Sequence, residues 1–434
     1  MSSLIARRGA FEHRNPRLFV LFTTLYNARA YYPILAIFFT DLGLSLDQFV
    51  LLNFAWAAAI FLLEVPSGAL ADTLGRKKLL VTSAALMVLE MGLLLLAPKD
   101  GGPLLLILCF ANRILSGASE AAASGADEAI AYDALPEADR DSQWDDVLAT
   151  AMRWRAVGFL IAMSLGGLLY DPSWLESLTG HEISRSFTHR LPMALVFLQA
   201  LGCLAIALRL EEVTTIHTER IGTRCARAFR LTLGTARHVF TSRPIAIVLF
   251  GGLLIDAVAR NFATLNSAYY RLIDIPAWAF GFIGSFVAVG NWFVPAVAKR
   301  LNHRFPPLGV LSLSAAFLAV SLFLLAPAWP WLGLIPAVLL MTLLGFVGFT
   351  LSRFLHRHAT SEQRATMLSV KGLAFNLGYG GYSLAFSLLL AGLGKTSDSA
   401  LQEALWWQAG GITLILLLYF SWAARPRTSA KTLE

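Results

Sequence analysis

Apolar stretches of about twenty residues recur along almost the whole chain, and this feature limits the fold more than any other. A helix needs about 20 mostly apolar residues to cross the hydrocarbon core of a bilayer. The 434 residues are 56% hydrophobic and only 15% charged, whereas an average soluble protein is roughly 25% charged. The runs are continuous and lack the alternation of barrel strands. The sequence therefore predicts an all-α integral membrane protein.

The apolar stretches predict twelve transmembrane helices, six on each side of one polar segment. We expect an N-terminal six-helix bundle over residues 1–208, a cytoplasmic linker over 209–243 and a C-terminal six-helix bundle over 244–434. Apolar residues recur every four positions in the linker, beside several arginines, which is typical of an amphipathic helix on the inner leaflet or of a solvated basic loop. The first six spans are Leu18–Thr40, Phe49–Leu70, Leu79–Ala97, Leu104–Ala123, Val147–Leu169 and Leu191–Leu208. The second six are Ile245–Tyr270, Trp278–Ala298, Leu308–Ala326, Leu332–Arg353, Met367–Leu393 and Trp406–Ala424.

Lys and Arg are concentrated in every second connecting segment, and this asymmetry predicts the orientation. Positively charged residues accumulate on the cytoplasmic side of membrane proteins. With the N-terminus inside, the inside segments hold most of the basic residues, so we expect both termini to be cytoplasmic. The net charge of +7 is then explained by topology, and no nucleic-acid partner is expected. The outside segments hold only Lys99, Arg185, Arg190, Arg271 and Lys395.

A segment rich in Gly and basic residues follows the second predicted span. It reads Gly68-Ala69-Leu70-Ala71-Asp72-Thr73-Leu74-Gly75-Arg76-Lys77-Lys78. This signature segment resembles the G-x-x-x-D-x-x-G-R-K/R motif of the major facilitator superfamily, at the position where that family carries it. The resemblance covers essentially the whole chain, and it implies two six-helix bundles that form a secondary transporter.

The residues of the signature segment suit a latch between helix ends. The two glycines of the segment permit a close helix approach and a tight turn. Asp72 can accept hydrogen bonds from helix N-terminal amides or pair with an arginine. Arg76 and Lys77 can reach an acid at a neighbouring cytoplasmic end, and Asp133 is the preferred candidate. Such a latch would stabilise one conformer. The alternative is that the basic residues only anchor the topology.

The fourth span carries a polar stripe that suits proton coupling. Arg113 and Gly117 resemble the R-x-x-x-G motif of the family, whose arginine is implicated in coupling in proton-coupled members. Glu120 and Asp127 continue the stripe at helical spacing, and we expect Glu120 to lie deep in the membrane. Glu64 in the second span is a further candidate protonation site, or alternatively a structural residue paired with Lys371 or an arginine. The stripe can alternatively be a structural ladder of ion pairs.

The fifth span matches the family's antiporter motif only in part. The motif reads G-x-x-x-G-P-x-x-G-G, and Gly158, Gly166 and Gly167 agree with it. Ala162 and Met163 replace its Gly-Pro pair. The departure leaves the direction of transport open.

Charged residues within spans 1 and 7 are candidates for the substrate path. A charge at mid-membrane costs about 2.5–3.5 kcal/mol on insertion scales, so such groups should pair or face water. We expect Arg29 to share a helix face with Tyr26 and Tyr32, and Glu90 in the third span to be structural. The full set of expected cavity residues is Arg29, Tyr32, Asp256, Arg260, Thr264 and Tyr382.

These features predict a secondary transporter that works by alternating access, with proton-coupled export of a small amphipathic drug-like molecule or metabolite. The alternative is proton-coupled import of a nutrient or siderophore-like solute. A non-transporting receptor or a membrane enzyme is a weaker prediction, because no catalytic, phosphate-binding or metal-ligand motif is present. We expect a monomer in the cell (inner) membrane, with no cofactor and no metal, whose partners are its substrate, protons and the lipid bilayer.

Overall fold

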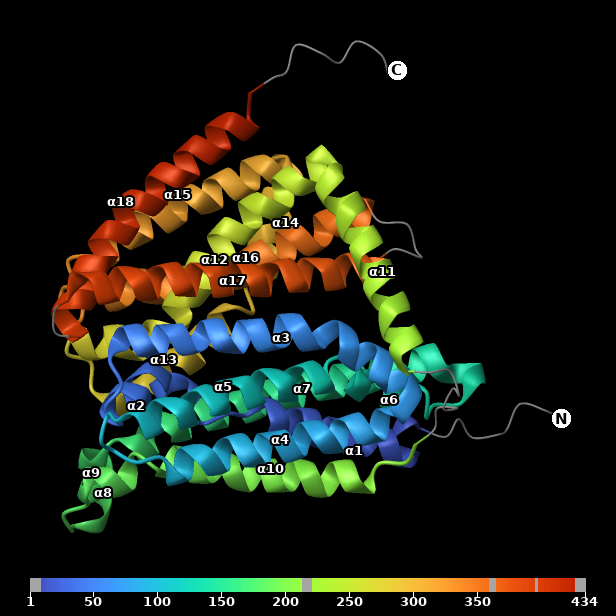
Figure 1. Ribbon diagram of the computed structural model, residues 1–434, viewed down its shortest axis with the longest axis horizontal. Coiled ribbons are helices and arrows are strands. Elements are labelled where there is room, and N and C mark those ends of the chain that lie inside the picture. Colours follow the sequence, from blue (N-terminus) through green and yellow to red (C-terminus); the bar gives the residue numbers. More distant parts are fainter. Residues whose placement is uncertain (1–8, 213–220, 359–363, 395–396, 426–434) are drawn as a thin grey trace. The chain divides into compact units, whose positions relative to one another are not determined.

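The computed structural model describes residues 9–212, 221–358, 364–394 and 397–425. Helices are the only regular elements within these ranges (Figure 1). This agrees with the all-α prediction. The chain divides into two compact units, and each is described by itself below. Unit 1 comprises Met1–Thr232 with Pro276–Phe286, and unit 2 comprises Leu233–Ile275 with Val287–Glu434.

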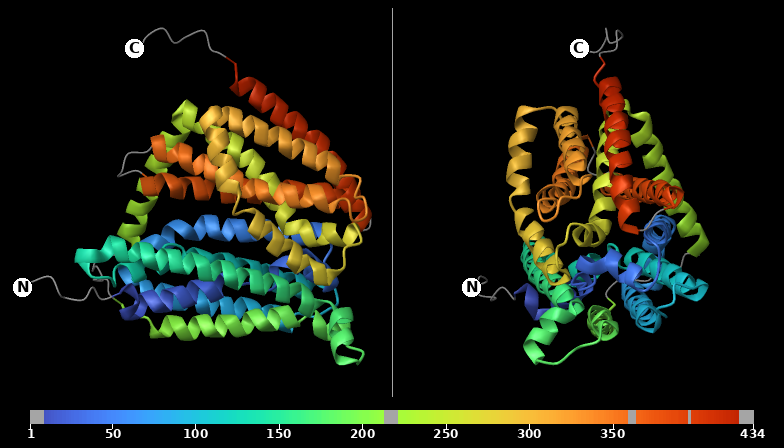
Figure 2. Two further views of the ribbon diagram at one scale, coloured as in Figure 1. Left: turned by 180° about the vertical axis from the view of Figure 1, so that it is seen from behind. Right: turned by 90° about the vertical axis from the view of Figure 1, so that its left-hand side faces the viewer.

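Unit 1 is a bundle of long helices, in which α5 packs against α3 and α4, α10 packs against α4, and α1 packs against α7 (Figures 1 and 2). Short helices connect them. The elements are α1 Arg14–Asn27, α2 Leu35–Asp41, α3 Leu46–Leu74, α4 Arg76–Leu96, α5 Pro103–Ala123, α6 Ala126–Tyr132, α7 Arg140–Tyr170, α8 Pro172–Thr179, α9 Arg185–Thr188 and α10 Leu191–Arg209.

Unit 2 is also helical, with α12 packed against α16 and α17, and with α15 packed against α16 and α18. Two helices cross from one unit to the other: α11 at residues 232–233 and α13 at residues 286–287. The elements are α11 Ile221–Thr241, α12 Arg243–Leu272, α13 Ala277–Gly290, α14 Val294–Arg304, α15 Pro307–Leu325, α16 Leu334–His358, α17 Arg364–Leu393 and α18 Ser397–Ala423.

Ten helices of the described ranges are long and apolar enough to cross a membrane, and an eleventh span results if α13 and α14, which are bent by 43°, are counted together. The count of twelve therefore stays a prediction. Most of the expected spans coincide with a single long helix; for example, Leu79–Ala97 corresponds to α4. The protein is accordingly a multi-pass membrane protein.

The prediction of one continuous helix over Leu18–Thr40 is wrong. The helix α1 ends at Asn27, and a short 3-10 turn precedes α2. Two local features explain the break. Pro33 lacks a backbone N–H and disfavours the helical conformation of the residue before it. Asn27 donates its side-chain amide to the Thr23 carbonyl at 2.7 Å. The break places Arg29 in an irregular segment between two helices.

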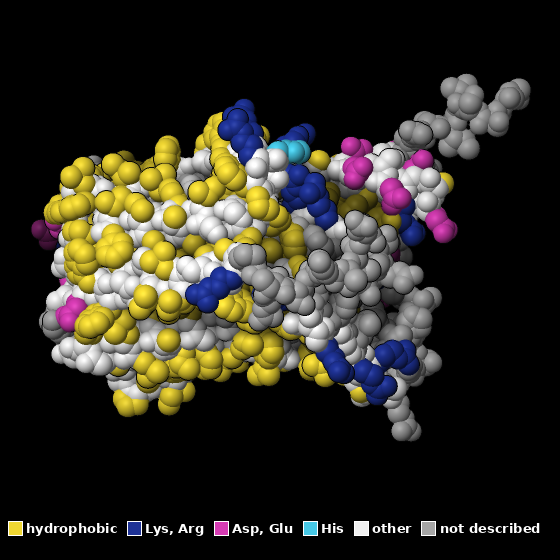
Figure 3. Space-filling view, turned by 90° about the horizontal axis from the view of Figure 1, so that it is seen from above, with side chains coloured by type: hydrophobic (Ala, Val, Ile, Leu, Met, Phe, Trp, Pro, Cys, Tyr) yellow, Lys and Arg dark blue, Asp and Glu magenta, His cyan; other side chains and the backbone are white. Residues whose placement is uncertain are grey.

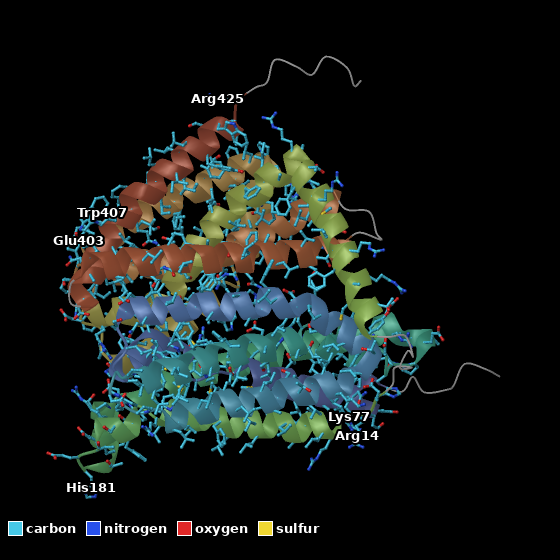
Figure 4. All side chains as sticks on the ribbon, in the orientation of Figure 1. Arg14, Lys77, His181, Glu403, Trp407 and Arg425 are labelled. Carbon is cyan, nitrogen blue, oxygen red and sulfur yellow. The ribbon has the colours of Figure 1, made fainter. Side chains whose placement is uncertain are left out.

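Several charged residues lie at or near the ends of the helices. In unit 1, Arg14 and Lys77 lie at one end of the bundle and His181 lies at the other (Figure 4). In unit 2, Arg425 follows the end of α18 opposite to Glu403 (Figure 4). Figure 3 shows hydrophobic side chains over most of one face, with the visible Lys and Arg mostly toward one end of it. This distribution suits a surface that contacts lipid.

Candidate functional site

The signature segment forms the tight connection between α3 and α4. Gly75 separates the two helices with φ of 96°, a conformation that costs little only for glycine. The Arg76 guanidinium forms an ion pair with Asp133 and donates to the Ala129 carbonyl at 2.8 Å. The expected contact of Arg76 with Asp133 is thus present, while its role as a gate stays a prediction.

Sequence analysis missed Glu212 as a partner of this segment. The backbone N–H of Lys77 donates to Glu212 Oε2 at 2.9 Å, so a carboxylate binds the positive N-terminal end of α4. A side chain at Gly75 would collide with the same carboxylate. The Asp72 side chain lies outside the described residues. At Gly68, an added Cβ would meet nothing within 4 Å, so the close helix approach expected there is absent.

A buried ion pair lies at the centre of unit 1. Arg29 Nη1 is 3.1 Å from Glu90 Oε1, and the two side chains are only 3% and 0% exposed. Arg29 also donates to the Tyr31 hydroxyl at 2.7 Å and lies 5.0 Å from the Tyr26 ring centroid. The predicted helix face shared by Tyr26, Arg29 and Tyr32 is absent, because α1 ends at Asn27, although Arg29 still lies against the Tyr26 ring. Tyr31, not Tyr32, hydrogen-bonds the guanidinium, because the helix breaks before Arg29.

A network of hydroxyl groups adjoins this pair. The Tyr26 hydroxyl is 2.7 Å from Ser119 Oγ, and Ser83 donates to the Ser119 carbonyl at 2.7 Å. Asn112 donates to the Glu90 carbonyl at 2.8 Å. The network therefore joins α1, α4 and α5 through buried polar contacts, and Asn112 ties α5 to the backbone of the residue that carries the carboxylate facing Arg29.

Arg113 lies on the face of α5 that packs against α3. Its guanidinium donates to Asn53 Oδ1 at 3.0 Å and lies 5.8 Å from the Trp56 ring centroid. The close approach is possible because Gly117, one turn later, leaves room for the Trp56 backbone. Arg113 Nε is buried and has no hydrogen-bond partner among the described residues. Arg113 is thus a buried cation that is bound by neutral groups.

The remaining residues of the expected stripe do not continue on one helix. The chain leaves α5 after Ala123, and Gly125 adopts a left-handed conformation before α6 begins. Asp127 consequently lies in the first turn of α6, where its side chain accepts a hydrogen bond from the Glu128 N–H at 2.8 Å. The Glu120 side chain is exposed at the surface of the described residues, and its depth in the membrane stays a prediction. Glu64 lies within electrostatic reach of Glu120, and its Oε2 is buried without a hydrogen-bond partner among the described residues.

A second buried pair lies in unit 2. Arg260 Nη2 is 2.8 Å from Asp256 Oδ2, one turn earlier on α12. Asp256 is 8% exposed and Arg260 is 29% exposed. Arg260 also donates to Asn376 Oδ1 at 3.2 Å and lies 5.6 Å from the Tyr379 ring centroid. Arg260 therefore contacts α17 as well as its ion-pair partner on α12.

Tyr379, rather than the expected Tyr382, contacts Arg260 of this pair. The Tyr379 hydroxyl lies 3.4 Å from Thr264 Oγ1. The Tyr382 hydroxyl instead accepts from Gln408 of α18 at 2.7 Å. Lys371, two turns before Tyr379, donates to Ser352 at 3.1 Å. The two residues that contact the Arg260 guanidinium outside the pair, Asn376 and Tyr379, thus both come from α17.

Glycines of both α7 and α13 permit a backbone contact between α7 and the first part of α13 within unit 1. An added Cβ at Gly167 would lie 2.9 Å from the Trp278 carbonyl oxygen, and one at Gly281 would overlap the Met163 carbonyl. Asp171 fixes the same contact, since its Oδ2 accepts from the Trp278 N–H at 3.1 Å. Met163, which departs from the antiporter motif, is therefore part of this contact.

The groups that bind metals in proteins do not cluster here. No group of three His, Cys, Asp or Glu side chains within the described ranges could hold an ion. The chemistry that these residues offer is instead ion pairing and proton exchange at buried carboxylates.

Comparison with known proteins agrees with this architecture. The model of the Major Facilitator Superfamily matches residues 17–380. Among solved structures, the nucleoside transporter NupG matches with a TM-score of 0.69 and 15% identity, over 95% of this chain and 99% of that chain. A POT family transporter in complex with 5-aminolevulinic acid gives 0.65 and 14%, over 95% and 97%. A D-xylose-proton symporter gives 0.60 and 17%, over 96% and 97%. A search of curated protein sequences found no significant match.

The fold and these matches define a multi-pass membrane transporter and not an enzyme. The chain belongs to the major facilitator superfamily.

Proposed function

We propose that this protein is a proton-coupled secondary transporter that works by alternating access and exports a small amphipathic molecule. The observation that carries the proposal is a carboxylate–guanidinium pair with a buried carboxylate in each unit, Arg29 with Glu90 and Asp256 with Arg260. A buried ion pair is costly to keep for stability alone. Protonation of either carboxylate would release its arginine, so the proton and an alternative partner can compete for the same group.

Arg113 supports coupling at the pair of unit 1. It is buried, its Nε lacks a hydrogen-bond partner among the described residues, and it lies within electrostatic reach of Glu90. When Glu90 is ionised, Arg113 adds a favourable charge. When Glu90 is protonated, two cations, Arg29 and Arg113, are left to repel each other or to bind an anion. We infer that this change of charge is the step that couples protons to substrate.

Export is tested in membrane vesicles once a substrate is found. A thermal-shift screen of the purified protein at two pH values, with nucleosides, sugars, short peptides and amphipathic dyes, identifies a ligand. Everted vesicles with an acid interior should then accumulate that ligand, and dissipation of the gradient with a protonophore should abolish accumulation. Equal accumulation with and without a gradient would contradict proton coupling.

Proton-coupled import of a nutrient or siderophore-like solute is the second candidate. It is favoured by the replacement of the motif's Gly-Pro pair by Ala162 and Met163 and by the fold that this chain shares with a D-xylose-proton symporter. The same ligand would then accumulate in right-side-out vesicles with an acid exterior and not in everted ones. We further propose that the protein acts as a monomer in the cell (inner) membrane, with both termini cytoplasmic.

A further inference from the structure

Unit 2 contains an apolar groove that belongs to neither buried ion pair. It has a volume of about 430 Å³ and lies between α14, α15 and α16, within the size of roughly 300–1,000 Å³ that is typical of ligand sites. Its aromatic lining comes from Phe293, Phe317 and Phe346. Phe293 is 68% exposed and Phe317 is 38% exposed, so the groove opens to the surroundings of the protein.

The bend between α13 and α14 opens one wall of this groove. The two helices meet at 43°. Pro295 in the first turn of α14 cannot continue the hydrogen-bond ladder, and Gly290 at the end of α13 lines the groove without a side chain. The helix α14 has 11 residues and is therefore about 16 Å long.

The groove offers no free polar group for a polar solute. Its only polar side chains are Ser314 and Thr342. Ser314 donates to the Val310 carbonyl at 2.9 Å, and Thr342 donates to the Leu339 carbonyl at 2.7 Å. Both hydroxyl groups are thus satisfied within their own helices. An acyl chain, which needs no hydrogen bonds, suits this lining.

Two arginines lie on the groove side of α14 where it ends. Val297 and Leu301 line the groove, and Arg300 and Arg304 each follow one of them by three residues, which places them on the same side of the helix. Both are exposed, and neither forms an ion pair with another residue that the structure describes. Two guanidinium groups one turn apart suit a phosphodiester, because arginine binds phosphate in a bidentate manner.

We propose that this groove binds one anionic phospholipid, with an acyl chain between α14, α15 and α16 and its phosphate at Arg300 and Arg304. Basic groups between membrane helices on the cytoplasmic side bind anionic headgroups, and the sequence predicts that the end of α14 lies on that side. This inference does not depend on what the protein transports.

Native mass spectrometry of the full chain in detergent, with dioleoyl phosphatidylglycerol as the probe, tests the proposal. Wild type should bind one molecule more tightly than dioleoyl phosphatidylcholine. Arg300→Gln/Arg304→Gln should weaken binding about 30-fold, as expected for two basic groups at a membrane surface. Val297→Trp should also abolish binding of phosphatidylglycerol, because the indole would fill the groove. Val297 is 49% exposed, so both variants should fold, which circular dichroism checks.

The matched control is Lys299→Gln/His303→Gln, which removes exposed basic residues from the other side of α14 and should change binding less than about 5-fold, the effect of a single surface charge. Four results would overturn the proposal. The first two are a loss of phosphatidylglycerol binding in the control as large as in Arg300→Gln/Arg304→Gln, and unchanged binding in Val297→Trp. The other two are displacement of the bound phosphatidylglycerol by free glycerol phosphate as effective as by the lipid itself, and a protein dimer in place of a lipid adduct.

Discussion

At the residue scale, the strongest constraint in unit 1 is the buried pair of Arg29 and Glu90. Removing one member of a buried pair leaves an uncompensated charge, which costs about 3–5 kcal/mol. We expect Glu90→Leu to lower stability by that amount, measured as the shift in unfolding midpoint of the detergent-solubilised protein. Arg29→Met/Glu90→Leu should regain most of the loss and still fail to transport. If the double variant is no more stable than Glu90→Leu, the pair is not the cause.

Arg113 allows a separate prediction, because it donates to the neutral Asn53 and not to a carboxylate. Arg113→Ala should abolish accumulation driven by a proton gradient, since the cation near Glu90 is lost, while membrane insertion stays normal. Accumulation in vesicles and the amount of inserted protein are the two measurements. Arg153→Ala, at an exposed site on α7, is the matched control and should behave as wild type. Normal accumulation in Arg113→Ala would remove α5 from the coupling mechanism.

At the element scale, the contact of α7 with α13 depends on the absence of side chains. Gly281→Val would force the two backbones apart, and overpacking of this kind costs about 1–3 kcal/mol. Ser164 Oγ and Ser285 Oγ are 3.3 Å apart across the contact. Cross-linking between Ser164→Cys and Ser285→Cys should therefore fall in the Gly281→Val background. It should be unchanged with Gly290→Ala, where an added Cβ meets nothing within 4 Å. An undiminished cross-link in Gly281→Val would show that the contact tolerates a side chain.

The bounds of the helices indicate what hydropathy could predict. The apolar runs predicted helices such as α4 and α12 to within a few residues, because each must satisfy its own backbone in lipid. They could not predict where a helix extends beyond its apolar run, as α7 does when it begins at Arg140 rather than near Val147. They also missed the break before Arg29, because apolar residues continue on both sides of it and mean hydropathy does not detect a change in backbone direction.

At the scale of the whole molecule, the family, the candidate charges and the contact of Arg76 with Asp133 followed from the sequence, whereas two other partners did not. The spacing within α12 predicted that Asp256 and Arg260 share a face, because both lie on one helix. Glu90 and Glu212 were missed as partners of Arg29 and Lys77, since those contacts join helices or loops that are far apart in the sequence. Pairing across elements depends on packing, which a single sequence does not encode locally.

The placement of one pair in each unit leads to a prediction about coupling. If proton exchange at unit 2 drives transport, Asp256→Asn should remove the titratable group while the amide keeps a contact with Arg260. Accumulation against a gradient should then be lost, whereas exchange of labelled for unlabelled ligand at equal pH should persist at a comparable rate. A pH-sensitive dye in the vesicle lumen should also report no ligand-driven proton movement.

The matched control is Asp398→Asn, at an exposed site in the first turn of α18, which should keep both accumulation and exchange. Retained proton movement in Asp256→Asn would leave Glu90 as the coupling carboxylate, and loss of exchange as well would assign Asp256 to ligand binding instead.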